Sequence, residues 1–259
     1  MHTDFTGGSQ ARRLSPFPVT TNGLASGNHL LEATSHALCE VVERDAEALW
    51  LRTPPAEQEA ARIDPATIAD PACEEVLSLL ERAGIAVAVW EITADVALPC
   101  FVAEITEDPR VALAAVAGAR GQGCHPRREI ALLRALTEAV QSRLTVITGS
   151  RDDIRRDDYA RATDPQNREA AWSAIVKAET PRSFDSVPTR SSPTFDEDLA
   201  HELACLREVG IDRVIRVELG GAVAGGMSVV RVVVPDLDHC IDPAVYRPGP
   251  RARRLRPPL

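Results

Sequence analysis

Two long amphipathic segments constrain the fold of this chain more than any other feature of its sequence. Apolar residues recur at helical spacing from His29 to Leu51 and again from Pro126 to Gly149, so each segment predicts a long helix with one buried face. Pro54 and Gly149 are typical helix terminators and mark where the two patterns end. A fold that contains both helices must offer each of them an apolar surface to pack on.

Shorter patterns predict the rest of the architecture. Helices are expected over 72–83, closed by Gly84, and from Phe195 to Val209, closed by Gly210. Apolar runs predict strands at Ala86–Ile92, Cys100–Ile105, Val111–Val116, Val214–Leu219 and Met227–Val234. Because helices and strands are interspersed and no internal repeat stands out, the sequence predicts an α+β (mixed α/β) fold, a single domain with long helices packed on β-sheet.

The segments between these elements are rich in turn-forming residues. Thr20–Asn28 predicts a turn-rich segment, and Gly118–His125 predicts a loop because it holds three glycines in six residues. Residues 150–195 predict a surface excursion with a short amphipathic piece at Ala170–Ala178, and the tail from Pro235 is expected to be irregular. The excursion is interpreted as part of one domain and not as a domain boundary.

The composition limits what this chain binds. Its 259 residues are 44% apolar, enough for a sizeable core, whereas a net charge of −9 and an aromatic content of 4% argue against nucleic acid as a partner. The only lysine, Lys177, has no glycine near it, which excludes a Walker-type phosphate-binding loop. No apolar run approaches the ~18 residues that span a bilayer, and no signal-peptide pattern is present. We therefore expect a cytoplasmic protein without a membrane partner.

The six cysteines indicate reduced thiols rather than a metal centre. They are widely spaced and form no Cys-x-x-Cys pair, so neither a zinc site nor a redox dithiol is predicted. Cys124, between Gly123 and His125, has the neighbours that most suggest a nucleophile. We favour a structural role for it.

The two long helices carry more polar side chains than an amphipathic pattern requires. Residues at positions i, i+3 and i+4 converge on one patch of a helix. That spacing is shared by Glu40, Glu43 and Arg44 on the first helix and by Glu138, Gln141 and Ser142 on the second. Both helices follow a glycine-bearing segment, whose free amides suit phosphate oxygens, while carboxylates suit Mg²⁺. The two patches together predict a metal–nucleotide site.

Two alternatives to such a site remain open. Glu and Arg at helical spacing usually form a solvated face with a modest ion pair. Glu40 and Glu138, however, are embedded among apolar neighbours, where an unpaired carboxylate is costly to bury. A hydrolase that uses Glu40 and Glu43 is disfavoured, because side chains one turn apart on one helix face do not flank a bond from opposite sides.

Several segments, in consistent order from about Thr20 to Asp238, resemble the YcaO family and its TfuA-associated branch. They are Thr21–Asn28 leading into Glu32-Ala33 and Ala37–Ala46, then Gly121–His125 followed by Ala131–Arg143, and finally Val229–Pro235. The resemblance implies an enzyme that uses ATP and Mg²⁺ to activate a backbone amide of a peptide or protein by O-phosphorylation, giving a thioamide or an azoline. It also implies a TfuA-like partner that delivers sulfur, and it leaves a homodimer open.

The resemblance also assigns residues to roles. As Mg²⁺ ligands it implies Glu40, Glu43 and Glu138. For the ATP site it implies Asn22, Ser26, Asn28, Glu40, Arg44, Gln141 and Arg143. No catalytic residue is assigned beyond these ligands.

One departure from the family concerns the N-terminus. Family members begin with a further portion that carries a Ser- and Glu-containing helix of the ATP site, so we expect the YcaO-like domain to be N-terminally truncated. The expected division is an irregular segment at 1–20, the YcaO-like domain at 20–238 and a Pro/Arg-rich tail at 239–259. A missing lobe should leave apolar helix faces uncovered. The alternative function is a catalytically silent accessory or binding subunit, including an accessory factor for thiomethylation of a ribosomal protein.

Overall fold

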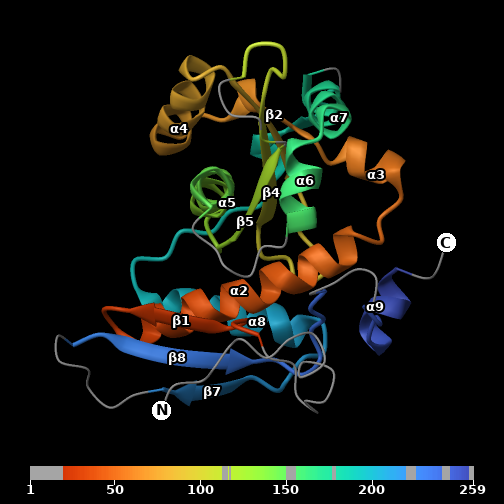
Figure 1. The fold of residues 1–259 in the computed structure, drawn as a ribbon. Helices are drawn as coiled ribbons and strands as arrows, with labels where there is room; N and C mark the ends of the chain where they lie inside the picture. Colours follow the sequence, from red (N-terminus) through yellow and green to blue (C-terminus); the bar gives the residue numbers. More distant parts are fainter. Residues whose placement is uncertain are drawn as a thin grey trace.

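The computed structural model describes residues 20–112, 116, 118–149, 156–176, 179–219, 226–240 and 246–256. Within these ranges the chain forms two three-stranded antiparallel sheets, and long helices pack on both (Figure 1). The predicted mixed α/β fold is confirmed. No helix in the described ranges is long and apolar enough to cross a membrane.

The first sheet joins segments from the two ends of the chain. Its strand order is β1 (Leu24–Gly27), β8 (Ser228–Val233) and β7 (Ile215–Glu218). Helix α2 (Leu30–Trp50) packs on β1 and β8, and α8 (Phe195–Glu208) packs beside α2. Small and β-branched side chains of this sheet join the inner face of α2 in one apolar core.

The second sheet supports the other long helix. Its order is β3 (Ile85–Glu91), β4 (Cys100–Glu107) and β5 (Ala119–Cys124). Helix α5 (Arg128–Thr148) lies along β5 and β4, and α4 (Pro71–Arg82) packs beside α5 and β3. Since α2 also contacts β5, the two long helices approach each other across this strand.

Short elements complete the description. Helix α7 (Pro165–Val176) packs on β3 and β4, within the predicted surface excursion. The remaining helices and strands are α3 (Pro55–Ala60), β2 (Ile63–Asp64), α6 (Arg156–Thr163), β6 (Arg182–Ser183) and α9 (Pro250–Leu255), with 3-10 turns at Pro65–Thr67 and Phe184–Ser186. Strands β2 and β6 pair in parallel.

The structure confirms both long helices, the two shorter helices and four of the five predicted strands to within a few residues. Helix α5 begins at Arg128 and not at Pro126, with Arg127 as its N-cap. The exception is the strand predicted at Val111–Val116. Val111, Ala112 and Val116 are not in a strand, and 113–115 lie outside the described residues.

Two segments expected to be loop or turn instead contain strands. Residues 24–27 of the turn-rich segment form β1, and most of the glycine-rich segment forms β5. A Cβ atom on Gly121 would lie 2.1 Å from the Ala139 nitrogen, and one on Gly123 would lie 2.0 Å from the Ala131 oxygen. These glycines therefore serve the close approach of α5 to the sheet and not a flexible loop.

The tail was expected to be irregular, but residues 250–255 form helix α9. Arg251 is buried and donates from Nη1 to both carboxylate oxygens of Asp45 on α2 at 2.8 Å. The Asp238 main-chain N–H also donates to Asp45, and the Asp238 carboxylate accepts from the Gly249 N–H at 3.0 Å. The tail is thus anchored to α2 by a buried ion pair, which composition does not reveal. Residues 1–19 of the predicted N-terminal segment lie outside the described residues.

Candidate functional site

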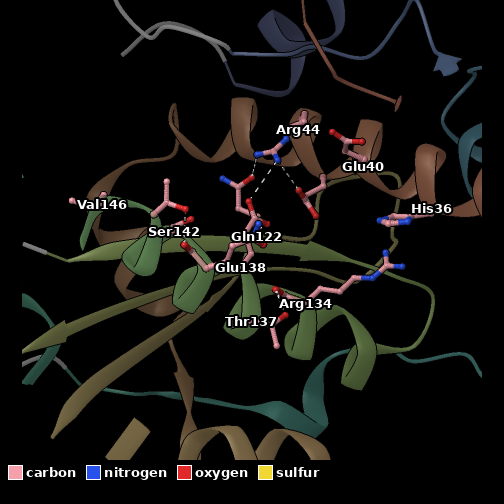
Figure 2. A pocket seen from close by; sticks show the side chains of 12 residues that line it. His36, Glu40, Arg44, Gln122, Arg134, Thr137, Glu138, Ser142 and Val146 are labelled. Carbon is pink, nitrogen blue, oxygen red and sulfur yellow. Dashed lines mark hydrogen bonds and ion pairs between the residues drawn. The ribbon is translucent and has the colours of Figure 1, made fainter. Parts of the chain in front are cut away.

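A cavity of about 770 Å³ lies between α2 and α5, where the two predicted polar patches face each other (Figure 2). Helix α2 contributes one wall, α5 the other, and β5 a single residue. The lining residues are His36, Glu40, Glu43 and Arg44 from α2, Gln122 from β5, and Arg134, Thr137, Glu138, Gln141, Ser142, Thr145 and Val146 from α5. Five of the predicted site residues therefore line the same cavity: Glu40, Glu43, Arg44, Glu138 and Gln141.

Arg44 lies at the centre of a charged cluster in this cavity. Its Nη2 is 3.5 Å from Glu43 Oε1 and 3.7 Å from Glu138 Oε1, while its Nη1 is 3.7 Å from Glu47 Oε2. Nη1 also donates a hydrogen bond to Gln122 Oε1 at 2.5 Å (Figure 2). One guanidinium group therefore links carboxylates from both long helices.

Two carboxylates of the cavity have raised pKa values, chiefly because they are buried. Burial raises the pKa of Glu43 to about 8; the nearby Arg44 opposes this shift, and the negative charges of Glu138 and Glu40 add to it. Burial likewise raises the pKa of Glu40, against the opposing effect of Arg44. An additional cation would favour the ionised form of both groups.

The donor set suits a hard divalent cation. Carboxylate oxygens from Glu40, Glu43 and Glu138 line one cavity, and Glu43 is only 7% exposed. Within the described residues, no three His, Cys, Asp or Glu side chains are already arranged around a common metal position. Glu43 and Glu138 contact Arg44 instead, so a metal ion would require these side chains and the guanidinium to shift.

The other predicted ATP-site residues lie in different places. Asn22 lines a smaller adjoining cavity of about 340 Å³ that shares Glu40 and Arg44 with the first. Ser26 and Asn28 are exposed and line neither cavity, and the Asn28 N–H donates to Glu32 Oε2 at 2.7 Å. Ser26 lies in β1 and Asn28 in the bend between β1 and α2, and both are outside the cavities.

Arg143 also departs from its predicted place as a phosphate contact. It is buried on the sheet side of α5, and its Nη2 lies 2.5 Å from Glu107 Oε1 on β4. One residue along a helix turns the side chain by about 100°, so Arg143 faces the sheet while Ser142 faces the cavity. Its role in the structure is an ion pair between helix and sheet.

Among the cavity residues that sequence reasoning missed are Arg134 and Gln122. Arg134 precedes Glu138 by one helical turn, a spacing that would have identified it, and it donates from Nη1 to the Cys124 carbonyl at 3.0 Å. Figure 2 shows it reaching toward His36, away from the cluster around Arg44. Burial lowers the pKa of His36, and the charge of Arg134 lowers it further. Gln122 lies in a segment that carries the family resemblance, but its glycines predict a loop, which gives no reason to place the side chain in the cavity.

Cys124 has a structural role. Its side chain is fully buried in β5, opposite Cys100 on β4, within the apolar core beneath the cavity. Burial, followed by its contact with Cys100, raises the pKa of the Cys124 thiol well above its usual value. A protonated, inaccessible thiol is not a nucleophile.

Comparison with known proteins identifies the family. The sequence matches the family model described as YcaO cyclodehydratase, ATP- and Mg²⁺-binding, over residues 2–238. A Rhizobium leguminosarum bv. trifolii protein described by its place in the tfuA 3′ region is 37% identical over 243 residues, which are 91% of this chain and 56% of the relative. A Methanothermobacter thermautotrophicus protein is 36% identical over 246 residues, which are 93% of this chain and 61% of the relative. The chain thus spans 56% and 61% of the lengths of these two relatives.

Solved structures share the fold. The structure of YcaO from Methanopyrus kandleri bound with AMPPCP and Mg²⁺ has a TM-score of 0.66 and 22% identity, covering 92% of this chain and 61% of that one. A heterocyclase in complex with substrate and cofactor has a TM-score of 0.67 and 22% identity, covering 87% of this chain and 30% of that one. Together with the match to the family model, these likenesses confirm the resemblance read from the sequence motifs: the chain belongs to the YcaO family.

Proposed function

We propose that the cavity between α2 and α5 holds ATP with Mg²⁺, and that the chain is part of a YcaO enzyme that activates a backbone amide of a peptide or protein. The observation that carries this proposal is the convergence of Glu40, Glu43, Glu138 and Arg44 on one cavity. The family is ATP- and Mg²⁺-binding, and the donor set of the cavity suits both a divalent cation and an anionic phosphate chain.

Each residue has a role in this proposal. Glu40, Glu43 and Glu138 hold Mg²⁺, which neutralises phosphate charge when bound. Arg44 contacts a phosphate oxygen, and Gln141 and Asn22 contribute neutral polar groups from the main cavity and the adjoining one. Phosphoryl transfer requires mainly positioning and charge neutralisation, and a cavity between two packed helices supplies both.

The reaction follows from the family's chemistry. A nucleophile adds to the amide carbonyl, the resulting oxyanion attacks the γ-phosphoryl group of ATP, and ADP leaves. Loss of phosphate then gives a thioamide when the nucleophile is sulfide, or an azoline when it is a neighbouring Cys, Ser or Thr side chain. We favour the thioamide and a TfuA-like partner that delivers the sulfur, because a relative lies in a tfuA 3′ region. The substrate is a peptide or protein; no role for nucleic acid or membrane is proposed.

A catalytically silent accessory subunit is the second candidate. Val140, Leu144 and Ile147 form an apolar stripe on α5 and are 39%, 57% and 47% exposed. An unpartnered apolar stripe is typical of a surface that another polypeptide covers. If so, the purified chain should self-associate, and Leu144→Gln should reduce the self-association. Light scattering of both proteins tests this, and a monodisperse wild-type monomer would contradict it.

The enzyme proposal is tested by phosphate release from ATP with Mg²⁺, sulfide and candidate peptides, followed by mass spectrometry for replacement of a peptide oxygen by sulfur. Glu138→Gln and Glu40→Gln should each reduce ATP turnover on the order of 100-fold, because each removes a ligand charge but little volume. Glu81→Gln, an exposed position on α4 outside the cavity, is the matched control. Wild-type turnover in both cavity variants would contradict the site; folded wild-type protein without turnover would favour the accessory subunit.

A further inference from the structure

Gln122 belongs to the segment Gly121–His125, for which the sequence predicted no individual site residue. It lies in β5 between two glycines that allow α5 to pack directly on the strand. As a result its side chain is only 5% exposed, yet it lines the cavity between α2 and α5. A polar side chain at such a depth must satisfy its hydrogen bonds locally.

Gln122 forms one bond to each wall of the cavity. Its main-chain N–H donates to Glu138 Oε2 at 3.1 Å, and its side-chain Oε1 accepts from Arg44 Nη1 at 2.5 Å. The other oxygen of Glu138, Oε1, lies 3.7 Å from Arg44 Nη2. The three residues therefore form a closed ring in which Gln122 fixes both the carboxylate of α5 and the guanidinium of α2.

The contacts of Arg44 differ on its two sides. Nη2 faces Glu43 and Glu138, carboxylates proposed to hold Mg²⁺, whereas Nη1 donates to Gln122 at 2.5 Å and has Glu47, which is outside the proposed metal site, at 3.7 Å. A divalent cation that takes those carboxylates repels the guanidinium and removes its Nη2 partners. The neutral Gln122 amide is not taken by the cation, so its bond to Nη1 retains Arg44 at the cavity while the guanidinium shifts, with Nη2 available to an anion.

We propose that Gln122 is a positioning residue of the nucleotide site: by holding Arg44 over the cavity, it sets the affinity for ATP with Mg²⁺. This inference rests on the proposed function. Gln122→Met retains the length of the side chain and the main-chain bond to Glu138 but removes the acceptor for Arg44. We expect it to weaken binding of ATP with Mg²⁺ by about tenfold, the loss typical of one hydrogen bond to a charged group.

A double-mutant cycle with Arg44→Met separates positioning from packing. If Gln122 acts through Arg44, adding Gln122→Met to Arg44→Met changes the dissociation constant of ATP with Mg²⁺ by less than about twofold. Gln58→Met is the matched control, because Gln58 donates to the Trp50 carbonyl at 2.9 Å outside the cavity, and it should leave the dissociation constant unchanged. A tenfold loss from Gln122→Met in both backgrounds would overturn the proposal.

A second cycle uses the same four proteins without nucleotide: the wild type, Gln122→Met, Arg44→Met and the double variant. It measures the urea concentration at which half of each protein is unfolded. The link between Gln122 and Arg44 predicts that Gln122→Met lowers this midpoint in the wild-type background and leaves it unchanged in Arg44→Met. If the wild-type protein binds no ATP with Mg²⁺, the proposed function fails, and this second cycle still decides whether Gln122 positions Arg44. If Gln122→Met lowers the urea midpoint equally in the wild-type and Arg44→Met backgrounds, Gln122 does not position Arg44.

Discussion

Two charged clusters lie side by side on α2 and are built differently. Arg44 belongs to the cavity cluster with Glu43, Glu138 and Gln122, and its contacts to the two carboxylates are 3.5 and 3.7 Å long. The next residue, Asp45, belongs to the tail cluster, where Arg251 donates to both of its oxygens at 2.8 Å.

The difference lies in how directly each carboxylate is bonded and not in the charge balance, because Arg251 also pairs with two carboxylates, those of Asp45 and Asp95. In the tail cluster the Asp45 carboxylate is fully buried and is bonded by Arg251 and by the Asp238 N–H. In the cavity cluster several carboxylates share one guanidinium at longer range, and burial raises the pKa of Glu43 to about 8. The Asp45 carboxylate is bonded directly without a ligand, although burial raises its pKa as well, whereas the cavity cluster has room and negative charge for another cation. Four measurements test this distinction, from the largest expected effect to the smallest.

Arg251→Met should destabilise the protein by about 3–5 kcal/mol, because it leaves the carboxylate of Asp45 buried without its cation. Urea unfolding at pH 7 measures the loss. Arg253→Met, on the exposed side of the same short helix, is the matched control and should cost less than about 0.5 kcal/mol. A loss from Arg251→Met below that of the control would show that the tail cluster is not structural.

Glu43→Gln should stabilise the protein relative to the wild type at pH 8 and above, where the folded wild type must bury the ionised carboxylate. The pKa of Glu43 is raised from 4.5 to about 8 in the folded state, so the folded protein holds this proton while the unfolded chain releases it. Wild-type stability should therefore fall as the pH rises from about 4.5 to 8, and the variant should lack that part of the fall. Unfolding curves across this range test it, and identical pH profiles would contradict the raised pKa.

Arg44→Met should cost only about 1 kcal/mol at pH 7, because the cluster is partly exposed and Glu43 already favours its proton. Mg²⁺ should recover part of the loss, since a divalent cation replaces the missing positive charge. The measurement is urea unfolding with and without Mg²⁺. A loss as large as that from Arg251→Met would mean that the two clusters are equivalent.

Mg²⁺ binding at pH 7 should release up to about one proton, because ionised carboxylates bind the metal and Glu43 is protonated beforehand. Calorimetry in two buffers of different ionisation enthalpy measures the release. Glu43→Gln should lower it, whereas Arg253→Met, far from the cavity, should not. Equal proton release by wild type and Glu43→Gln would assign the proton to another group.

The parts of the fold that were predictable are those in which a local pattern has one cause. Apolar spacing in α2 and α5 reflects burial of one face, and the structure confirms both helices. A glycine-rich pattern can arise from a flexible loop or from close packing of the backbone. Gly121 and Gly123 serve close packing, so the loop prediction was wrong and β5 was missed. Helix α9 was missed because its stability comes from a contact of Arg251 with distant Asp45, which no local pattern records.

The residues of the candidate site likewise fall into those that helical spacing predicts and those that depend on packing between distant segments. Helical spacing brought Glu40 and Glu43 to one face, and the opposing Glu138 meets them across the cavity. Arg143 was predicted in the site, but which arginine lines the cavity depends on which face of α5 meets the sheet, and the structure places Arg143 against Glu107 and Arg134 in the cavity. Gln122 reaches the site only through packing between strand and helix, so no spacing rule could identify it.

The central claim is that the cavity between α2 and α5 binds ATP through a metal ion held by its carboxylates. Calorimetric titration of the purified chain with ATP, with and without Mg²⁺, tests it most directly. The claim predicts binding that requires Mg²⁺, is lost in Glu40→Gln and Glu138→Gln, and is retained in Glu81→Gln. A folded protein that binds no ATP, or that binds it equally well without Mg²⁺ or in the two cavity variants, would contradict the claim.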